Sequence, residues 1–277
     1  MDSNDIPPVI GENGGTETEM VVRWRWWLHV ILLGILPVIV GVMGYLGRHR
    51  TIALLPPTAA GLLQVCLLEM GFFAVVFAVA WLISRANAQQ MLLPWRDGVM
   101  PLLLGFAGSI ALRLLVMVLL MPIAIVWLLL NGKGASQLQQ MRPGTEHLLD
   151  ATALVRSPVY FVLCLTLVSF VVAGLREELW RAGLLAGFKA LFPRQFETWR
   201  GRVIAVAVVS LLFGSGHTVQ GWLGVCATTL LGMGLGAIML WRRSIWEAVI
   251  AHGFFDASTF VALYFLTKYH AVPFQSL

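Results

Sequence analysis

Charged residues are scarce in this sequence. Of its 277 residues only 12% are Asp, Glu, Lys or Arg, whereas 58% are hydrophobic. Soluble domains carry about 25% charged residues, so this composition excludes an ordinary soluble protein. The hydrophobic residues form continuous runs, not the ten-residue alternation of a membrane β-barrel. We therefore predict an all-α polytopic membrane protein, a helical bundle with about seven transmembrane helices.

Cysteine is also rare, and three recognisable catalytic signatures are missing. Cys66, Cys164 and Cys226 lie inside apolar runs without CxxC spacing, so neither a cysteine metal site nor a redox centre is expected. The sequence has no HExxH motif, in which one helix presents two histidines to zinc. No nucleophile motif surrounds Ser215 or Ser258, which makes serine catalysis a weak alternative.

The basic residues exceed the acidic ones, 19 to 14, for a net charge of +5. They lie mostly at the ends of apolar runs, as residues that set membrane topology do, so we expect membrane lipid and no nucleic acid as a partner. The connecting segments on the N-terminal side carry ten Lys and Arg and those on the other side six, which predicts a cytoplasmic N-terminus. The ten are Arg23, Arg25, Arg85, Arg96, Lys189, Arg194, Arg200, Arg202, Arg242 and Arg243.

The apolar runs divide the chain into four parts. Residues 1–22 are polar and acidic and predict a disordered tail. Residues 23–130 predict three N-terminal transmembrane helices, residues 131–156 a polar loop, and residues 157–270 a four-helix core. The expected spans are about residues 26–46, 58–83, 100–130, 158–189, 203–217, 221–241 and 245–268.

Two ionisable residues, Glu69 and Arg113, lie inside apolar runs of the first half. Such residues are costly in lipid and face a partner or a cavity. Two interpretations are open: the two residues pair between helices, or each snorkels or caps a cavity by itself.

A charged cluster, residues 176–181, interrupts the fourth apolar run with four charges in six residues. Near the bilayer centre each ionised side chain costs roughly 2.5–3.5 kcal/mol, so the cluster either lies at the membrane surface or faces a cavity. On a helix Arg181 can meet Glu177, four residues away, or Glu178, three residues away. In isolation such a pair is more often structural than catalytic.

Two histidines lie in later apolar runs, each one helical turn from a second distinctive residue. Phe213 precedes His217 by four residues, and His252 precedes Asp256 by four. Each histidine alone is more often structural, as a helix cap or a satisfied buried pair. However, buried ionisable groups in membrane segments are functional by default, and groups on three separate helices at such spacings can converge.

These residue types fit amide hydrolysis. A carboxylate, Glu177 or Glu178, beside the imidazole of His217 can hold and deprotonate water. A second histidine, His252, oriented by Asp256, can donate a hydrogen bond to the oxyanion. Alternatively, His217, His252 and Glu177 could bind zinc with water in the fourth position, although the preferred mechanism needs no cofactor.

The three motifs resemble those of the CPBP intramembrane proteases, which include CAAX prenyl endopeptidases and bacteriocin-processing or Abi-like self-immunity proteins. That family shows EExxxR, FxxxH and then HxxxN or HxxxD on successive membrane helices. Phe213 to His217 matches the second motif, and His252 to Asp256 the third in its acid form. The resemblance covers about residues 155–270. It implies an intramembrane endopeptidase of the glutamic type that cleaves a peptide or protein, lipidated or not.

The first motif departs from the family pattern. Glu177 and Glu178 are followed by two residues before Arg181, where the family has three. Aligned on the glutamates, Glu177 is the first glutamate, which is usually the family's base; aligned on the arginine, it is the second. Either a helical irregularity restores the geometry or the chain uses another register. We expect Glu177 as the base, with Glu178 as the alternative, and Arg181 and Phe213 in supporting roles.

Two other functions remain open at this point. The shortened first motif would also suit a catalytically inactive protein of the same fold that binds a partner, as an immunity or scaffolding protein. A weaker alternative is a proton-coupled transporter that relays protons through Glu69, Arg113 and the acids of the second half.

Overall fold

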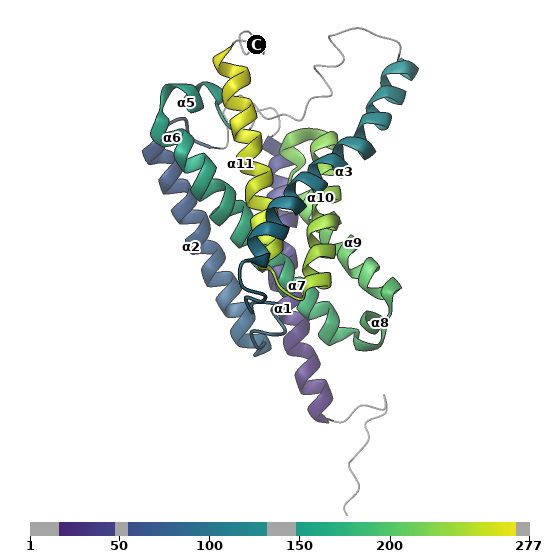
Figure 1. Ribbon diagram of the computed structural model, residues 1–277. Helices are drawn as coiled ribbons and strands as arrows, with labels where there is room; N and C mark the ends of the chain where they lie inside the picture. The colour runs from purple at the N-terminus through teal and green to yellow at the C-terminus, as the bar shows by residue number, and fades with distance from the viewer. Residues whose placement is uncertain (1–16, 48–54, 132–147, 270–277) are drawn as a thin grey trace, which may run out of the picture.

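The computed structural model describes residues 17–47, 55–131 and 148–269, and in these ranges the chain is helical without a β-strand (Figure 1). This confirms the predicted all-α fold class. The helices are α1 (Glu17–Gly47), α2 (Ala59–Ser84), α3 (Met100–Asn131), α5 (Ala151–Arg156), α6 (Pro158–Leu163), η2 (Cys164–Arg176), α7 (Glu177–Leu191), α8 (Pro193–Glu197), α9 (Trp199–Ser215), η3 (Thr218–Gln220), α10 (Gly221–Arg242) and α11 (Trp246–Lys268).

The ends of these helices follow local sequence signals. Thr58 caps α2, because its hydroxyl accepts a hydrogen bond from the backbone N–H of Gly61. Ser157 ends α5 and caps α6, and Pro158 occupies the first turn, where a missing N–H costs nothing. Most of the predicted tail and loop, residues 1–16 and 132–147, lies outside the described residues. Residues 17–22 of that tail belong to α1, and residues 151–156 of that loop form α5.

Six helical segments in the described part are long and apolar enough to cross a membrane. The predicted count of about seven is not confirmed, because the expected fifth span corresponds to α9, which has only 17 residues. At 1.5 Å per residue that is about 25 Å, slightly less than the ~30 Å hydrocarbon core. Apolar side chains are widely exposed on the outer faces, for example Leu82, Leu130 and Trp241, as expected for contact with lipid.

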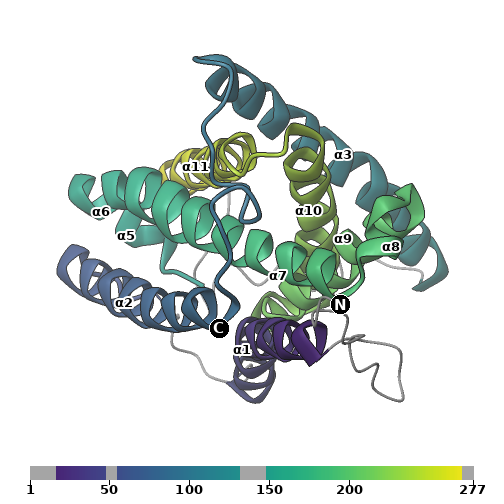
Figure 2. The ribbon, with the colours of Figure 1, turned by 90° about the horizontal axis from the view of Figure 1, so that it is seen from below.

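The fourth span is one continuous helix from Pro158 to Leu191 and lies in the middle of the bundle. Viewed along the bundle, it runs between α1 and α2 on one side and α10 and α11 on the other (Figure 2). Residues 181–187 are buried on all sides of the helix. A helix buried all round forms the core of a bundle, so the side chains of α7 have neighbours from both halves of the chain.

A π-helical stretch, η2, forms the 13 residues directly before Glu177. Its Ser169 hydroxyl donates to the carbonyl of Cys164, five residues earlier, over 2.7 Å. Gly174 permits a close approach of α11, since a Cβ at this position would lie 3.0 Å from the carbonyl oxygen of Val249. Because π-helical segments are rare and concentrate at functional sites, this one directs attention to the charged cluster that follows it.

Candidate active site

The two adjacent glutamates of α7 occupy different environments. The side chain of Glu178 is completely buried, whereas that of Glu177 is 17% exposed. Neighbouring residues on an α-helix point about 100° apart, because a turn takes 3.6 residues, so the two carboxylates cannot share one face. They therefore pair with different arginines, although both lie near His252, and are suited to different tasks.

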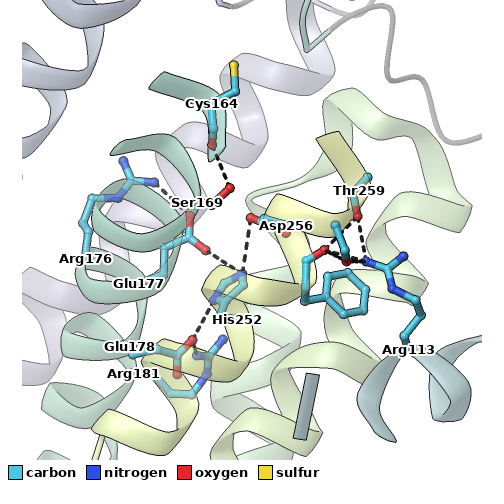
Figure 3. Close-up of polar contacts among 12 residues, drawn as sticks. Arg113, Cys164, Ser169, Arg176, Glu177, Glu178, Arg181, His252, Asp256 and Thr259 are labelled. Carbon is cyan, nitrogen blue, oxygen red and sulfur yellow. Dashed lines mark hydrogen bonds and ion pairs between the residues drawn. The ribbon is translucent and has the colours of Figure 1, made fainter. Parts of the chain in front are cut away.

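Glu178 belongs to a buried cluster with Arg181 and His252 (Figure 3). Its Oε1 forms an ion pair with Arg181 and accepts a hydrogen bond from Nδ1 of His252 at 2.9 Å. The Arg181 guanidinium also lies 4.6 Å from the centre of the Phe213 ring, a cation–π distance. Since Glu178 has no exposed surface, its geometry suits holding the imidazole of His252 in place.

Glu177 is held by the arginine directly before it in the sequence. Its Oε1 accepts a hydrogen bond from Arg176 at 2.8 Å, and another nitrogen of Arg176 donates to Glu69 on α2, also at 2.8 Å. The suggested pair between Glu69 and Arg113 does not form. Arg113 on α3 instead donates to the carbonyl of Phe255 on α11 at 2.5 Å and to two nearby hydroxyls, because α3 packs against α11 and not α2.

His217 lies just beyond the end of α9, and one nitrogen of its ring makes a hydrogen bond to the backbone of that helix. Its Nδ1 lies 2.8 Å from the carbonyl oxygen of Phe213, which can only accept, so Nδ1 carries a proton. In a neutral imidazole this leaves Nε2 as an acceptor. The Phe213 ring lies between the two histidines, with its centre 4.7 Å from the ring of His217 and 6.1 Å from that of His252.

His252 on α11 lies between the buried Glu178 and the partly exposed Glu177, and its own side chain is 3% exposed. With Nδ1 bonded to Glu178, its Nε2 lies 3.8 Å from Oε2 of Glu177 and 3.9 Å from Oδ2 of Asp256 (Figure 3). The carboxylate that accepts the orienting hydrogen bond of His252 is thus Glu178 and not Asp256, which the sequence had suggested. The structure brings Glu177, Glu178, Arg181, His252 and Asp256 together, and Phe213 links this group to His217.

A cavity of about 300 Å³ opens beside these residues. Glu177 and His217 both line it, together with Arg176 and Glu69, whereas Glu178 does not. Its apolar walls come from α1, α2, α7 and the C-terminal end of α9. They comprise Leu36, Pro37, Val40, Phe72, Phe73, Trp180, Phe213 and Gly216. The walls from α1 and α2 carry no sequence signal, because apolar residues that face a cavity look like those that face lipid.

The zinc alternative needs Glu177, His217 and His252 to converge. In the described residues, no group of three or more His, Cys, Asp or Glu side chains is arranged to hold a metal ion. One nitrogen of each histidine is already engaged, by the Phe213 carbonyl and by Glu178. The absence of a required metal stays a prediction, with zinc as the alternative, and chelation can test it.

The motif-bearing part of the chain matches a known family. Residues 158–258 match the family described as type II CAAX prenyl endopeptidase, Rce1-like. The match begins at the first turn of α6 and ends shortly after Asp256, so it contains all three motifs but not α1 to α3. No curated protein and no solved structure matches the chain significantly. Residues 158–258 are therefore similar to the Rce1-like type II CAAX prenyl endopeptidases, consistent with the CPBP family.

Proposed function

We propose that this integral membrane protein is an endopeptidase in which Glu177 and His217 activate water for attack on a peptide bond. The family match supports a membrane peptidase at the level of the domain. The observation that carries the finer proposal is that this carboxylate and this imidazole line the same cavity while coming from different helices. Both groups are suited to general base catalysis, which contributes typically 10²–10⁴-fold to a rate.

Glu177 is the proposed base in preference to Glu178. One oxygen of Glu177 is bonded to Arg176 and the other lies 3.8 Å from Nε2 of His252, beyond hydrogen-bond distance, so this oxygen is not held by a hydrogen bond to that imidazole. A base must reach the proton it removes, directly or through one water, and Glu178 has no surface in the cavity. Glu178 is instead a positioning residue for His252.

His252 is the proposed donor to the oxyanion of the tetrahedral intermediate. In its doubly protonated form it keeps its Nδ1–H on Glu178 and presents Nε2–H to the gap between Glu177 and Asp256. A donor fixed in advance by a buried carboxylate costs no reorganisation when charge develops. Loss of such a donor typically lowers kcat by about 10²–10³.

The substrate is a peptide segment with apolar side chains, lipidated or not. The cavity has one polar side, formed by Glu69, Arg176, Glu177 and His217, and is otherwise apolar. The polar side would hold the scissile amide and the water, and the apolar walls would hold the flanking side chains or a lipid group. The excess of basic residues at one end of the bundle supports a cytoplasmic N-terminus.

The test is cleavage by the purified protein in lipid nanodiscs. The peptides are a farnesylated CAAX peptide, its unlipidated counterpart and a bacteriocin leader peptide, with products identified by mass spectrometry. Cleavage by the wild type that is lost in both Glu177→Gln and His217→Asn supports the proposal. The matched control is Glu197→Gln, an exposed acid on α8 outside the cavity, which should cleave normally. Cleavage that survives in both site variants refutes the proposal.

The second candidate function is non-enzymatic binding on the same fold. It is favoured by one observation, the two-residue spacing between Glu178 and Arg181 where the family has three. It predicts that the wild type leaves all three peptides intact and still binds one of them. Such binding would survive Glu177→Gln, which removes only the charge of the base.

A further inference from the structure

A second cavity, of about 530 Å³, lies between α7, α8 and α9 and takes no part in the site described above. It is lined by apolar side chains, among them Phe188 of α7 and Ile204 and Val208 of α9. Phe188 is eleven residues from Glu177, which is roughly 16 Å along the helix axis at 1.5 Å per residue. The volume is within the range of about 300–1,000 Å³ that is usual for small-molecule sites.

Two arginines line the same cavity, Arg194 of α8 and Arg200 of α9. Both are exposed, and in the part of the chain that the structure describes neither forms an ion pair with a carboxylate. Between residues 189 and 202 there are four basic residues and a single acid, Glu197. The cavity therefore combines an apolar interior with uncompensated positive charge at its rim.

This cavity lies at the end of the bundle where membrane and water meet. In Figure 1, α8 and the first turns of α1 are at the same, lower end of the molecule. Trp199 is 66% exposed there, and the Arg200 guanidinium lies 5.8 Å from the centre of its ring. From α1, the exposed Trp27 contacts Phe192, with ring centres 5.9 Å apart. Exposed tryptophans beside arginines are typical of the headgroup level of a bilayer.

We propose that this cavity binds one anionic diacyl phospholipid. An acyl chain enters between α7 and α9, and the phosphate lies between Arg194 and Arg200. A neutral lipid would use the apolar interior but not the arginines, and an acidic peptide would use the arginines but not the interior. Basic pockets between membrane helices bind anionic headgroups, and the lipid would connect α8 to the bilayer.

The experiment is native mass spectrometry of the protein released from nanodiscs that contain equal amounts of phosphatidylglycerol and phosphatidylcholine with identical chains. We expect one retained phosphatidylglycerol in the wild type. Each arginine near an anionic surface contributes about fivefold to affinity, so Arg194→Gln with Arg200→Gln should reduce its retention at least tenfold. The matched control is Arg23→Gln with Arg202→Gln, which removes the same charge outside the cavity and should leave retention within twofold.

A second pair of variants tests the acyl chain. Ile204→Trp places a larger side chain in the cavity and should displace the lipid, whereas Leu211→Trp, on the same helix but outside the cavity, should not. The two positions are matched, since Ile204 is 63% and Leu211 is 62% exposed. Equal retention of the two lipids, or retention of phosphatidylglycerol that neither the arginine nor the Ile204 variant lowers, would overturn the proposal. Peptide cleavage plays no part in this readout, so the result is independent of the proposed function.

Discussion

Replacing Glu178 by Gln removes the charge of a carboxylate that is fully buried between Arg181 and His252. The shape is preserved, but the guanidinium of Arg181, which is 1% exposed, loses its partner. Breaking a buried ion pair by neutralising one partner costs about 3–5 kcal/mol, because the remaining charge is uncompensated. The hydrogen bond from His252 also loses its charged acceptor. A hydrogen bond to a charged group contributes about 1.5–3 kcal/mol to stability, and part of this contribution is lost.

Glu177→Gln is the matched comparison for Glu178→Gln. It changes the same functional group one residue away, but Glu177 borders the cavity and its partner Arg176 keeps a second carboxylate, Glu69. We therefore expect a small loss of stability for Glu177→Gln and a large loss of activity, whereas Glu178→Gln should be strongly destabilised. At about 2–4 °C per kcal/mol, the Tm of Glu178→Gln should fall by roughly 6–20 °C.

The assay is thermal unfolding of both variants in the same detergent, followed by tryptophan fluorescence, together with cleavage measured below the lower Tm. The result that refutes the reasoning is a Glu178→Gln protein that is as stable as the wild type but inactive, beside an active Glu177→Gln protein. That outcome would make Glu178 the base and would mean that the cavity beside Glu177 is not the reaction site.

Three further predictions follow from the contacts of the site. Arg176→Met should lower kcat about tenfold or more with little change in KM, because Glu177 loses the group that fixes it and small misplacements of a base are costly. The control is Glu69→Gln, which leaves the bond between Arg176 and Glu177 intact and should have less effect in the same kinetic assay. Arg113→Met should destabilise the protein by about 1–3 kcal/mol, because hydrogen bonds from a charged donor to α11 are lost. Denaturant unfolding would measure this loss, and unchanged stability would show that these bonds contribute nothing. Treatment with 1,10-phenanthroline should leave cleavage unchanged, and loss of cleavage that zinc restores would support the metal alternative.

Composition was sufficient for the fold class, and spacing named the candidate residues of the site, which stay a prediction. A chain this apolar can satisfy its backbone in lipid only as helices, so the bundle followed from hydrophobicity alone. The one-turn spacing of His252 and Asp256 placed this pair on one helical face, whereas His217 lies beyond the end of the helix that carries Phe213. The count of spans was less secure, since α9 with 17 residues is close to the minimum length for crossing.

Pairing between helices was not readable from the sequence. The sequence suggested Arg113 as a partner for Glu69. The partner in the structure is Arg176, because α2 packs beside η2 while α3 packs beside α11. The orienting partner of His252 was likewise expected to be Asp256, on the same helix, and is Glu178 on α7. Contacts within one helix follow from periodicity, whereas contacts between helices depend on how the helices pack.

The amino-acid sequence by itself determined that the chain is an apolar helical bundle with carboxylates and imidazoles on three of its later helices. Only the tertiary structure decided which of Glu177 and Glu178 borders the cavity, because a π-helical stretch before Glu177 changes the direction in which every later side chain of that helix points. The structure also decided that α1 and α2 complete the cavity wall, since the chemistry of an apolar side chain is the same whether it faces lipid or a substrate.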